Sequence, residues 1–261
     1  DDIRGLNKFM KILFVYSNKT CGCTKKYTFE LARGMKKYVN TKVIYYTELT
    51  SDIVKEFDVI ILQRLGTITI IDKDEVNNII DIIEKNKNIK KFIYIMDDLV
   101  LESQNGLPIK FISHCTDVLC TSKTLAKYIR KYNDNVHVFH TFIDVESFDN
   151  IPENKSEKFT LVWASTGALG SNIIEGIVER KEAFKFDFDL IVIGGMYGQF
   201  RNEKWIKSYP ILKEDEMIKL IKSADILLNP LTLSEKNIEA IKYRCKEPLN
   251  DFLNSKSEVK Y

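Results

Sequence analysis

The sequence has no apolar run of the roughly 18 residues that a membrane-spanning helix needs. This absence excludes the transmembrane class and favours a cytoplasmic protein, with peripheral contact to a membrane left open. The chain also has little excess charge, because its 39 basic and 37 acidic residues give a formal net charge of +2. So small an excess gives no reason to expect a nucleic-acid partner.

The chain has few cysteines and histidines, which argues against disulfide frameworks and metal centres. Its five cysteines are scattered and odd in number, which suits a reducing compartment. Cys21 and Cys23 resemble half of a metal site, but no second Cys/His pair accompanies them. His137 and His140 lie at a strand end and should face opposite sides. We therefore predict no bound metal.

Residues 159–195 carry the most informative pattern. An apolar run over 159–164 precedes a small-residue turn, Ser165–Ser171, and a helix-like segment follows over 172–184. A second apolar run, 190–193, ends in Gly194 and Gly195. This order predicts a βαβ unit of a parallel sheet. The turn offers backbone N–H groups at a helix N-terminus, where an anion is favoured, although a generic αβ unit without a ligand fits as well.

The first half of the chain predicts a six-stranded α/β domain. Apolar runs mark its strands, and helices are expected over 25–38, after 72–74 and over 123–131, the last with Ser122 as its N-cap. The strands are expected at 11–16, 43–46, 59–62, 92–96, 117–120 and 136–139. Asp97 and Asp98 follow the fourth strand, at the end where open α/β sheets bind ligands. One of them serves equally well as a helix cap.

The second half predicts another, shorter sheet. Strands are expected at 159–164, 190–193, 205–209 and 225–228, with a helix over 213–223. The polar stretch 151–158 contains Pro152 and is the expected linker between domains 10–150 and 159–261, while residues 1–9 are left out of the fold. Because a helix beginning near Ser257 has no room to run, we expect the second domain to be incomplete, with a covering layer supplied by a further segment or a second copy.

Several motifs in the predicted order resemble one family. Residues 94–99, YIMDDL, are similar to "YDIDDL", and 116–122, TDVLCTS, to "ADAVLAVS". Residues 223–231, SADILLNPL, resemble "ADIFLLPS", and 252–261, FLNSKSEVKY, resemble "FNxxKSEIKYLE". The chain thus resembles, over residues 10–261, the nucleotide-sugar glycosyltransferases of the GT-B fold, in the retaining group called family 4. The resemblance implies two Rossmann-like doubly wound domains, the second cut short at the C-terminus.

The resemblance also implies an activity and a set of residues. Such an enzyme transfers a sugar, by a retaining route, from a nucleotide-sugar donor to a glycan, lipid or protein acceptor, with the donor as substrate and no cofactor. Asp97 and Asp98 would be catalytic, and Gly22 and Ser122 would contact the acceptor. The donor would bind Ser165, Thr166, Gly167, Gly194, Tyr209, Ile211, Asn254, Lys256, Ser257 and Glu258. Homo-oligomerisation stays open.

The sequence differs from the family's pattern at three places, and these differences leave other functions open. The turn Ser165–Ser171 lacks the Arg and Lys with which the family holds the diphosphate, and Ser255 stands where the family has the first of two glutamates. Asp97 replaces a common histidine. A non-catalytic GT-B-like subunit that binds a glycan or a sister enzyme is therefore one alternative, and a sugar-nucleotide epimerase is another.

Overall fold

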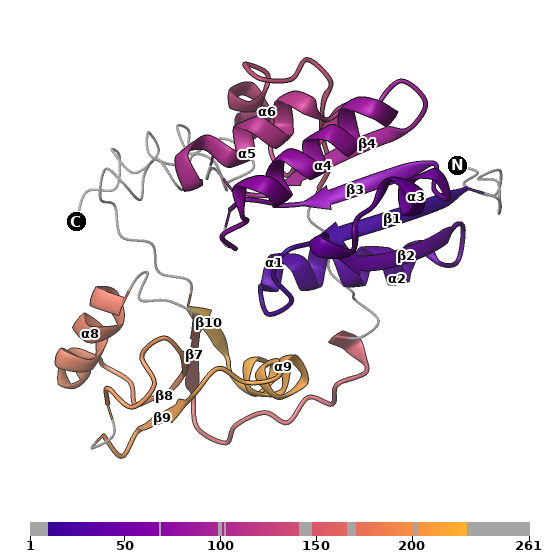
Figure 1. Ribbon diagram of the computed structural model, residues 1–261. Helices are drawn as coiled ribbons and strands as arrows, with labels where there is room; N and C mark the ends of the chain where they lie inside the picture. Colours follow the sequence, from indigo (N-terminus) through magenta and orange to yellow (C-terminus); the bar gives the residue numbers. More distant parts are fainter. Residues whose placement is uncertain are drawn as a thin grey trace. The chain divides into compact units, whose positions relative to one another are not determined.

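A computed structural model describes residues 10–67, 69–98, 101, 103–140, 148–165, 171–200 and 203–228. The described residues fall into two compact units, one ending at residue 140 and the other beginning at residue 148 (Figure 1). Each unit is an α/β domain around its own parallel sheet, so the predicted fold class is confirmed.

The first unit contains a six-stranded parallel sheet in the order β2-β1-β3-β4-β5-β6. Its strands are β1 (Lys11–Tyr16), β2 (Asn40–Tyr45), β3 (Val59–Gln63), β4 (Lys91–Met96), β5 (Asp117–Cys120) and β6 (Val136–Val138). All six strands predicted from the sequence are present, with ends shifted by up to three residues. Their apolar side chains are buried on both faces, as a parallel sheet requires.

The helices of this unit differ more from the predictions. A helical segment after β1 is composed of α1 (Gly22–Thr24), the π-helix η2 (Lys25–Glu30) and α2 (Leu31–Met35), so it ends before the predicted residue 38. The other elements are the 3-10 turn η3 (Tyr46–Glu48), α3 (Ser51–Lys55), α4 (Lys73–Asn86), α5 (Ser103–His114) and α6 (Lys123–Ile129).

Two of these helices, α3 and α5, were not predicted. In α5, residues Gln104, Asn105 and Gly106 have positive φ angles, so regular helix begins only after them. Pro108 then lies in the first regular turn, where a missing N–H is tolerated. Sequence analysis missed α5 because a glycine followed closely by a proline usually marks a loop, and α3 because it is only five residues long.

Helices cover both faces of the first sheet. Figure 1 shows α4, α5 and α6 along one face, and α1 and α2 on the other. The larger core lies on the first of these faces, where Val15 and Leu62 from the sheet share a buried cluster with Ile79 of α4 and Phe111 of α5. The sheet is therefore doubly wound.

The second unit has a four-stranded parallel sheet in the order β10-β7-β8-β9. Its elements are β7 (Thr160–Ser165), α8 (Ser171–Glu179), the 3-10 turn η4 (Lys181–Ala183), β8 (Asp189–Gly194), β9 (Ile206–Tyr209), α9 (Glu214–Ser223) and β10 (Ile226–Leu228). Ile174 of α8 packs in one core with Trp163, and Met217 of α9 packs against another that contains Val162. The predicted βαβ unit is present, with its helix ending at Glu179.

The stretch that begins the second unit is tied to the end of α9. Lys222 Nζ donates to the carbonyl oxygens of Phe148 and Ile151 at 2.9 and 2.6 Å, and Lys155 Nζ donates to the Ala224 carbonyl at 2.9 Å. Part of the segment predicted as a linker thus packs on the second unit. The domain boundaries remain a prediction, as does the incomplete second sheet, because residues 229–261 lie outside the described part of the chain.

Gly194 provides a test of this backbone geometry. It has a φ of +93°, and a Cβ at this position would lie 2.1 Å from the carbonyl oxygen of Ser165. Gly194→Ala should therefore lower the free energy of unfolding by about 1–3 kcal/mol. Gly176→Ala is the matched control, since no atom lies within 4 Å of its added Cβ, and it should stabilise α8 by up to about 1 kcal/mol. Urea titrations measure both effects, and a Gly194→Ala protein as stable as the wild type would contradict the geometry.

Candidate functional site

The strand order of each sheet reverses at one point, which marks a candidate ligand site in each unit. In the first sheet the chain moves in one direction from β1 to β2 and in the other from β3 onward, so the order reverses between β1 and β3. In the second sheet it reverses between β7 and β10. Open α/β sheets bind ligands at such switch points, outside the carboxyl ends of the strands.

Four side chains meet at the switch point of the first sheet. Arg64 directly follows β3, Asp97 and Asp98 follow β4, and Cys23 lies in α1, which follows β1. Arg64 Nη1 lies 3.1 Å from Cys23 Sγ, 3.3 Å from Asp97 Oδ2 and 3.4 Å from Asp98 Oδ2. Only 7% of the Arg64 side chain and 9% of the Asp97 side chain are exposed. We call this group the Arg64 cluster.

The backbone of Arg64 is held in a strained conformation. Its φ is +49°, a left-handed value that is unfavourable for a side chain of this size. Contacts on several sides fix it there: its N–H donates to the Ile95 carbonyl, Nε donates to Thr67 Oγ1, and Thr67 Oγ1 donates back to the Arg64 carbonyl. Strain that the surroundings over-determine is common at functional sites.

One carboxylate oxygen of Asp97 lacks a hydrogen-bond donor among the described residues. Its Oδ1 is buried and receives no hydrogen bond from any residue the structure describes, although Arg64 Nη1 is 3.1 Å away. Burial raises the pKa of Asp97, and the Arg64 guanidinium acts against that rise. Thr121 Oγ1 donates to the Asp97 carbonyl and helps to fix its backbone. A buried acceptor without a donor is costly, so a ligand that brings a donor would be favoured here.

The cluster also resembles a metal site, since ligand atoms of Cys23, Asp97 and Asp98 lie within 4.8 Å of one another. The guanidinium of Arg64, however, already contacts all three and supplies the positive charge. Burial raises the pKa of the Cys23 thiol, with the Asp97 charge adding to the effect, so Cys23 stays protonated and is a poor metal ligand. A metal ion would have to displace Arg64.

The structure shows Gly22 and Ser122 in different surroundings. Gly22 is exposed at the start of α1, beside Cys23. Ser122 is buried and caps α6, since its Oγ accepts a hydrogen bond from the Leu125 N–H at 3.1 Å. The predicted N-cap is thus confirmed, while acceptor binding by either residue remains a prediction. The sequence analysis did not include Arg64 among the site residues. The one signal that could have indicated it is its position directly after the buried strand β3.

Four of the predicted donor-binding residues lie at the carboxyl edge of the second sheet, which we call the Gly194 edge. Ser165, Gly194 and Tyr209 end β7, β8 and β9, and Ile211 follows β9. The Gly195 N–H donates to the Ser165 carbonyl at 2.7 Å, and a Cβ at Gly194 would lie 3.8 Å from Ile211 Cγ1. The other predicted donor residues, Thr166, Gly167, Asn254, Lys256, Ser257 and Glu258, lie outside the described part of the chain.

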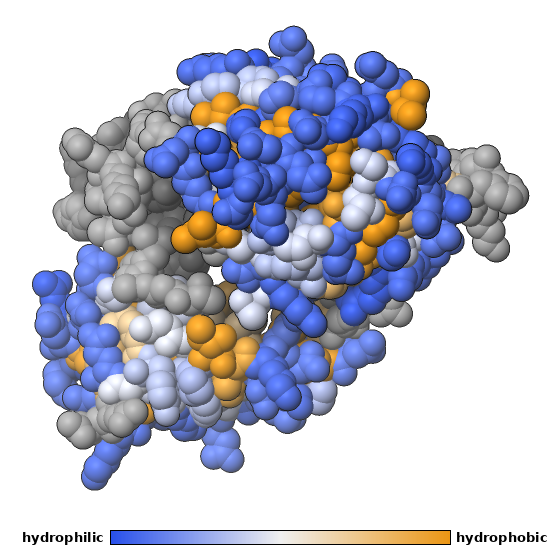
Figure 2. Space-filling model, viewed as in Figure 1, coloured by the Kyte–Doolittle hydropathy of each residue, from blue (hydrophilic) through white to orange (hydrophobic). Residues whose placement is uncertain are grey.

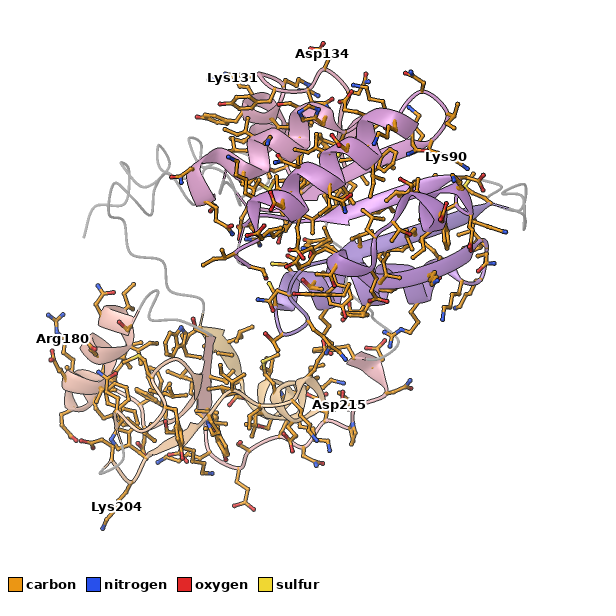
Figure 3. The ribbon with its side chains drawn as sticks, viewed as in Figure 1. Lys90, Lys131, Asp134, Arg180, Lys204 and Asp215 are labelled. Carbon is orange, nitrogen blue, oxygen red and sulfur yellow. The ribbon has the colours of Figure 1, made fainter. Side chains whose placement is uncertain are left out.

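The described surface away from these two edges is mainly polar and charged on the face that Figure 2 shows. Figure 2 shows the visible face of the first unit covered mainly by hydrophilic residues, with apolar ones in small separate groups. Several charged side chains labelled in Figure 3, such as Lys90, Lys131 and Lys204, lie in loops that lead into strands. Lys90 and Lys131 are therefore at the edge of the first sheet opposite the Arg64 cluster, and Lys204 is at the edge of the second sheet opposite the Gly194 edge. Among the described residues, no helix is long and apolar enough to cross a membrane.

Comparison with known proteins supports the fold. No family model and no curated protein matches the sequence. Among solved structures, an α-glucosyltransferase in complex with UDP and a 13-mer DNA containing a HMU base is similar with a TM-score of 0.67 at 13% identity, over 90% of this chain and 74% of that one.

Two further structures have the same architecture. The lipopolysaccharide outer core galactosyltransferase WaaB in its apo form has a TM-score of 0.53 at 12% identity, over 93% of this chain and 83% of that one. A glycosyltransferase from Rickettsia africae has a TM-score of 0.54 at 13% identity, over 85% and 73%. At these identities the likeness shows the fold alone, two Rossmann-like α/β domains of the GT-B type.

The burial of Asp97 predicts a pH dependence of stability. Because its pKa is raised on folding, Asp97 favours the folded state at low pH and loses that contribution as the pH rises through the folded pKa. Asp97→Asn removes this titration, so the free energy of unfolding of the variant minus that of the wild type should increase as the pH rises above about 4, the ordinary pKa of an Asp side chain. Chemical denaturation at several pH values measures the difference.

Asp117→Asn is the control with the opposite sign. Burial acts to raise the pKa of Asp117, but hydrogen bonds from Lys91, Thr116 and His137 lower it overall. Because its folded pKa lies below the ordinary Asp value, the free energy of unfolding of the variant minus that of the wild type should decrease as the pH rises toward about 4, and stay level above that. A shift of the same sign for both variants would contradict the assignment for Asp97.

Proposed function

We propose that the protein is a glycosyltransferase that moves a sugar from a nucleotide-sugar donor to a hydroxyl-bearing glycan, lipid or protein acceptor. The observation that carries the proposal is the Arg64 cluster, a buried charged group at the switch point of the first sheet, in which one carboxylate oxygen receives no hydrogen bond from the described residues. The three similar structures are all glycosyltransferases, which adds support.

The donor is assigned to the Gly194 edge of the second unit. Ser165 and Gly194 end two neighbouring parallel strands, and glycine permits close approach by a ligand. Backbone groups of Tyr209 and Ile211 would contact the nucleotide base. Thr166, Gly167, Asn254, Lys256, Ser257 and Glu258 are assigned to the diphosphate and sugar by the resemblance. Since one similar structure contains UDP, we take UDP-glucose as the first donor to test.

Asp97 and Asp98 are the proposed catalytic residues, and Gly22 and Ser122 the proposed acceptor contacts. In the transfer, the acceptor oxygen bonds to the anomeric carbon, the bond from that carbon to the diphosphate breaks, and its electron pair leaves with UDP. The hydroxyl proton passes to a carboxylate of the Arg64 cluster, which must be ionised to receive it. Retention at the anomeric carbon is an expectation from the resemblance.

Nucleotide binding tests the donor assignment. UDP should bind the whole chain, and Lys256→Ala should weaken binding by about 1–2 kcal/mol because it removes one charge-assisted contact. Lys204→Ala, an exposed lysine in the loop before β9, is the matched control and should leave the affinity unchanged. Titration calorimetry measures all three proteins. Equal loss in both variants would move the diphosphate away from Lys256.

Turnover distinguishes the enzyme from its alternatives. Release of UDP from UDP-glucose should fall by about 10²-fold or more in Asp97→Asn and in Asp98→Asn, the scale of a lost acid–base group, with UDP affinity retained. UDP binding without any turnover would favour the non-catalytic subunit, which the missing Arg and Lys of Ser165–Ser171 also favour. Release of an epimerised free sugar without an acceptor would identify the epimerase.

A further inference from the structure

We infer that an exposed cluster of aromatic rings on the second unit docks the protein on the interface of a lipid bilayer. Three half-exposed side chains, Phe159, Phe184 and Phe186, form its surface, and two less exposed rings, Phe188 and Trp205, lie beneath them. We call this cluster the Phe186 patch. The inference goes beyond the proposed function, because these residues precede β7, β8 and β9 and so lie at the edge of the second sheet opposite the Gly194 edge.

The local sequence explains how the rings come together. Phe184, Phe186 and Phe188 alternate with Lys185 and Asp187 in the segment that leads into β8, and alternate residues of an extended chain share one side. The ring centroids are 6.0 Å apart for Phe184 and Phe186, and 5.6 Å apart for Phe186 and Phe188. Of the three rings, Phe188 alone reaches the core, so the other two remain at the surface.

A buried cation holds the base of the patch in place. Lys181 Nζ lies 3.9 Å from the ring centroid of Phe188 and 5.2 Å from that of Trp205, which is the geometry of a cation–π contact. Phe159 extends the surface on the other side, with its centroid 5.5 Å from that of Phe186. The exposed rings therefore stand on a fixed base, which lowers the entropy cost of docking.

The exposed area of the patch argues against a stable protein partner. Phe159 and Phe184 are each 39% exposed, and Phe186 is 52% exposed. With about 200 Å² for a whole phenylalanine side chain, these fractions correspond to about 260 Å² of contiguous apolar surface. A stable protein interface buries about 800 Å² on each partner. A bilayer has no such minimum, because binding to it scales with whatever apolar area enters the boundary of the acyl chains.

The charges around the patch favour a bilayer without excess negative charge. Lys158 Nζ lies 2.7 Å from Asp187 Oδ2 and 2.9 Å from Asp189 Oδ1. Lys181 Nζ lies 2.7 Å from Asp187 Oδ1, so the two basic and two acidic groups of this network balance. Lys185 is exposed, and its long side chain can extend the ammonium group to the lipid headgroups. Docking then depends on the rings, and phosphatidylcholine is the lipid to test.

Sedimentation of the whole chain with phosphatidylcholine vesicles tests the inference. The wild type should bind, and Phe184→Ala/Phe186→Ala should weaken binding about tenfold or more, because apolar area is lost from the contact with the bilayer. Tyr38→Ala/Tyr132→Ala is the matched control, since these two rings of the first unit are 46% and 38% exposed, and it should bind like the wild type. A wild type that does not bind, or an equal loss in both variants, would overturn the inference.

Lipid charge and self-association separate the other occupants. Because the charges near the rings balance, phosphatidylglycerol in the vesicles or added salt should change the affinity by less than about twofold. Binding that requires phosphatidylglycerol and falls steeply with salt would show adsorption through basic residues and would overturn docking by the rings. A lipid-free dimer that Phe184→Ala/Phe186→Ala abolishes would assign the patch to a second copy of the chain instead.

A measurement on the wild type keeps the inference testable if that variant fails to fold. The Trp205 ring centroid lies 5.5 Å from that of Phe188, whereas Trp163, the second tryptophan of the chain, is buried in the core. Brominated phosphatidylcholine should therefore quench emission from Trp205, and Trp205→Phe should remove the quenched component. Unquenched emission would overturn docking through the patch. UDP titration of the same samples reports on the Gly194 edge, so its failure would count against glycosyl transfer alone.

Discussion

Parallel strand pairing is the constraint on which the rest of this structure depends. Because all strands of a sheet run in one direction, the segments that follow them emerge at one edge. In the first unit this places Cys23 after β1, Arg64 after β3 and Asp97 after β4 at a single corner, although they are up to 74 positions apart in the chain. In the second unit the same rule gathers Ser165, Gly194 and Tyr209.

Burial gives the Arg64 cluster its chemical character. Removing two carboxylates from water is unfavourable unless a partner offsets the cost, and Arg64 is that partner. The compensation is incomplete, since one oxygen of Asp97 receives no hydrogen bond from the described residues. The fold keeps this buried carboxylate and holds Arg64 at a left-handed φ beside it. Both features lower the free energy of unfolding, so the Arg64 cluster is maintained at a cost to stability. That combination ties the energetics of the first unit to the proposed acceptor chemistry.

The predictions from the sequence were most accurate where the local hydrophobic pattern was strongest. Continuous apolar runs predicted all six strands of the first sheet, because a strand buried on both faces must be apolar throughout. Helix ends were less accurate: the helix expected over 25–38 passes through a π-helix and ends at Met35, and α5 was missed behind Gly106 and Pro108. Ser122 was correctly expected to cap α6, since a helix cap is a local interaction.

The sequence by itself determined two α/β units, their strands, and the position of Asp97 and Asp98 at a strand's carboxyl end, because these depend on hydrophobic periodicity over a few residues. Only the tertiary structure decided which side chains meet there. The local signal for Arg64, its position directly after a buried strand, is weak, since an arginine after a strand is usually solvated. Its role arises from β3 pairing with both β1 and β4, which brings Cys23 and Asp97 to the same nitrogen. Strand order, and with it the composition of the site, is a property of long-range pairing that local sequence does not encode.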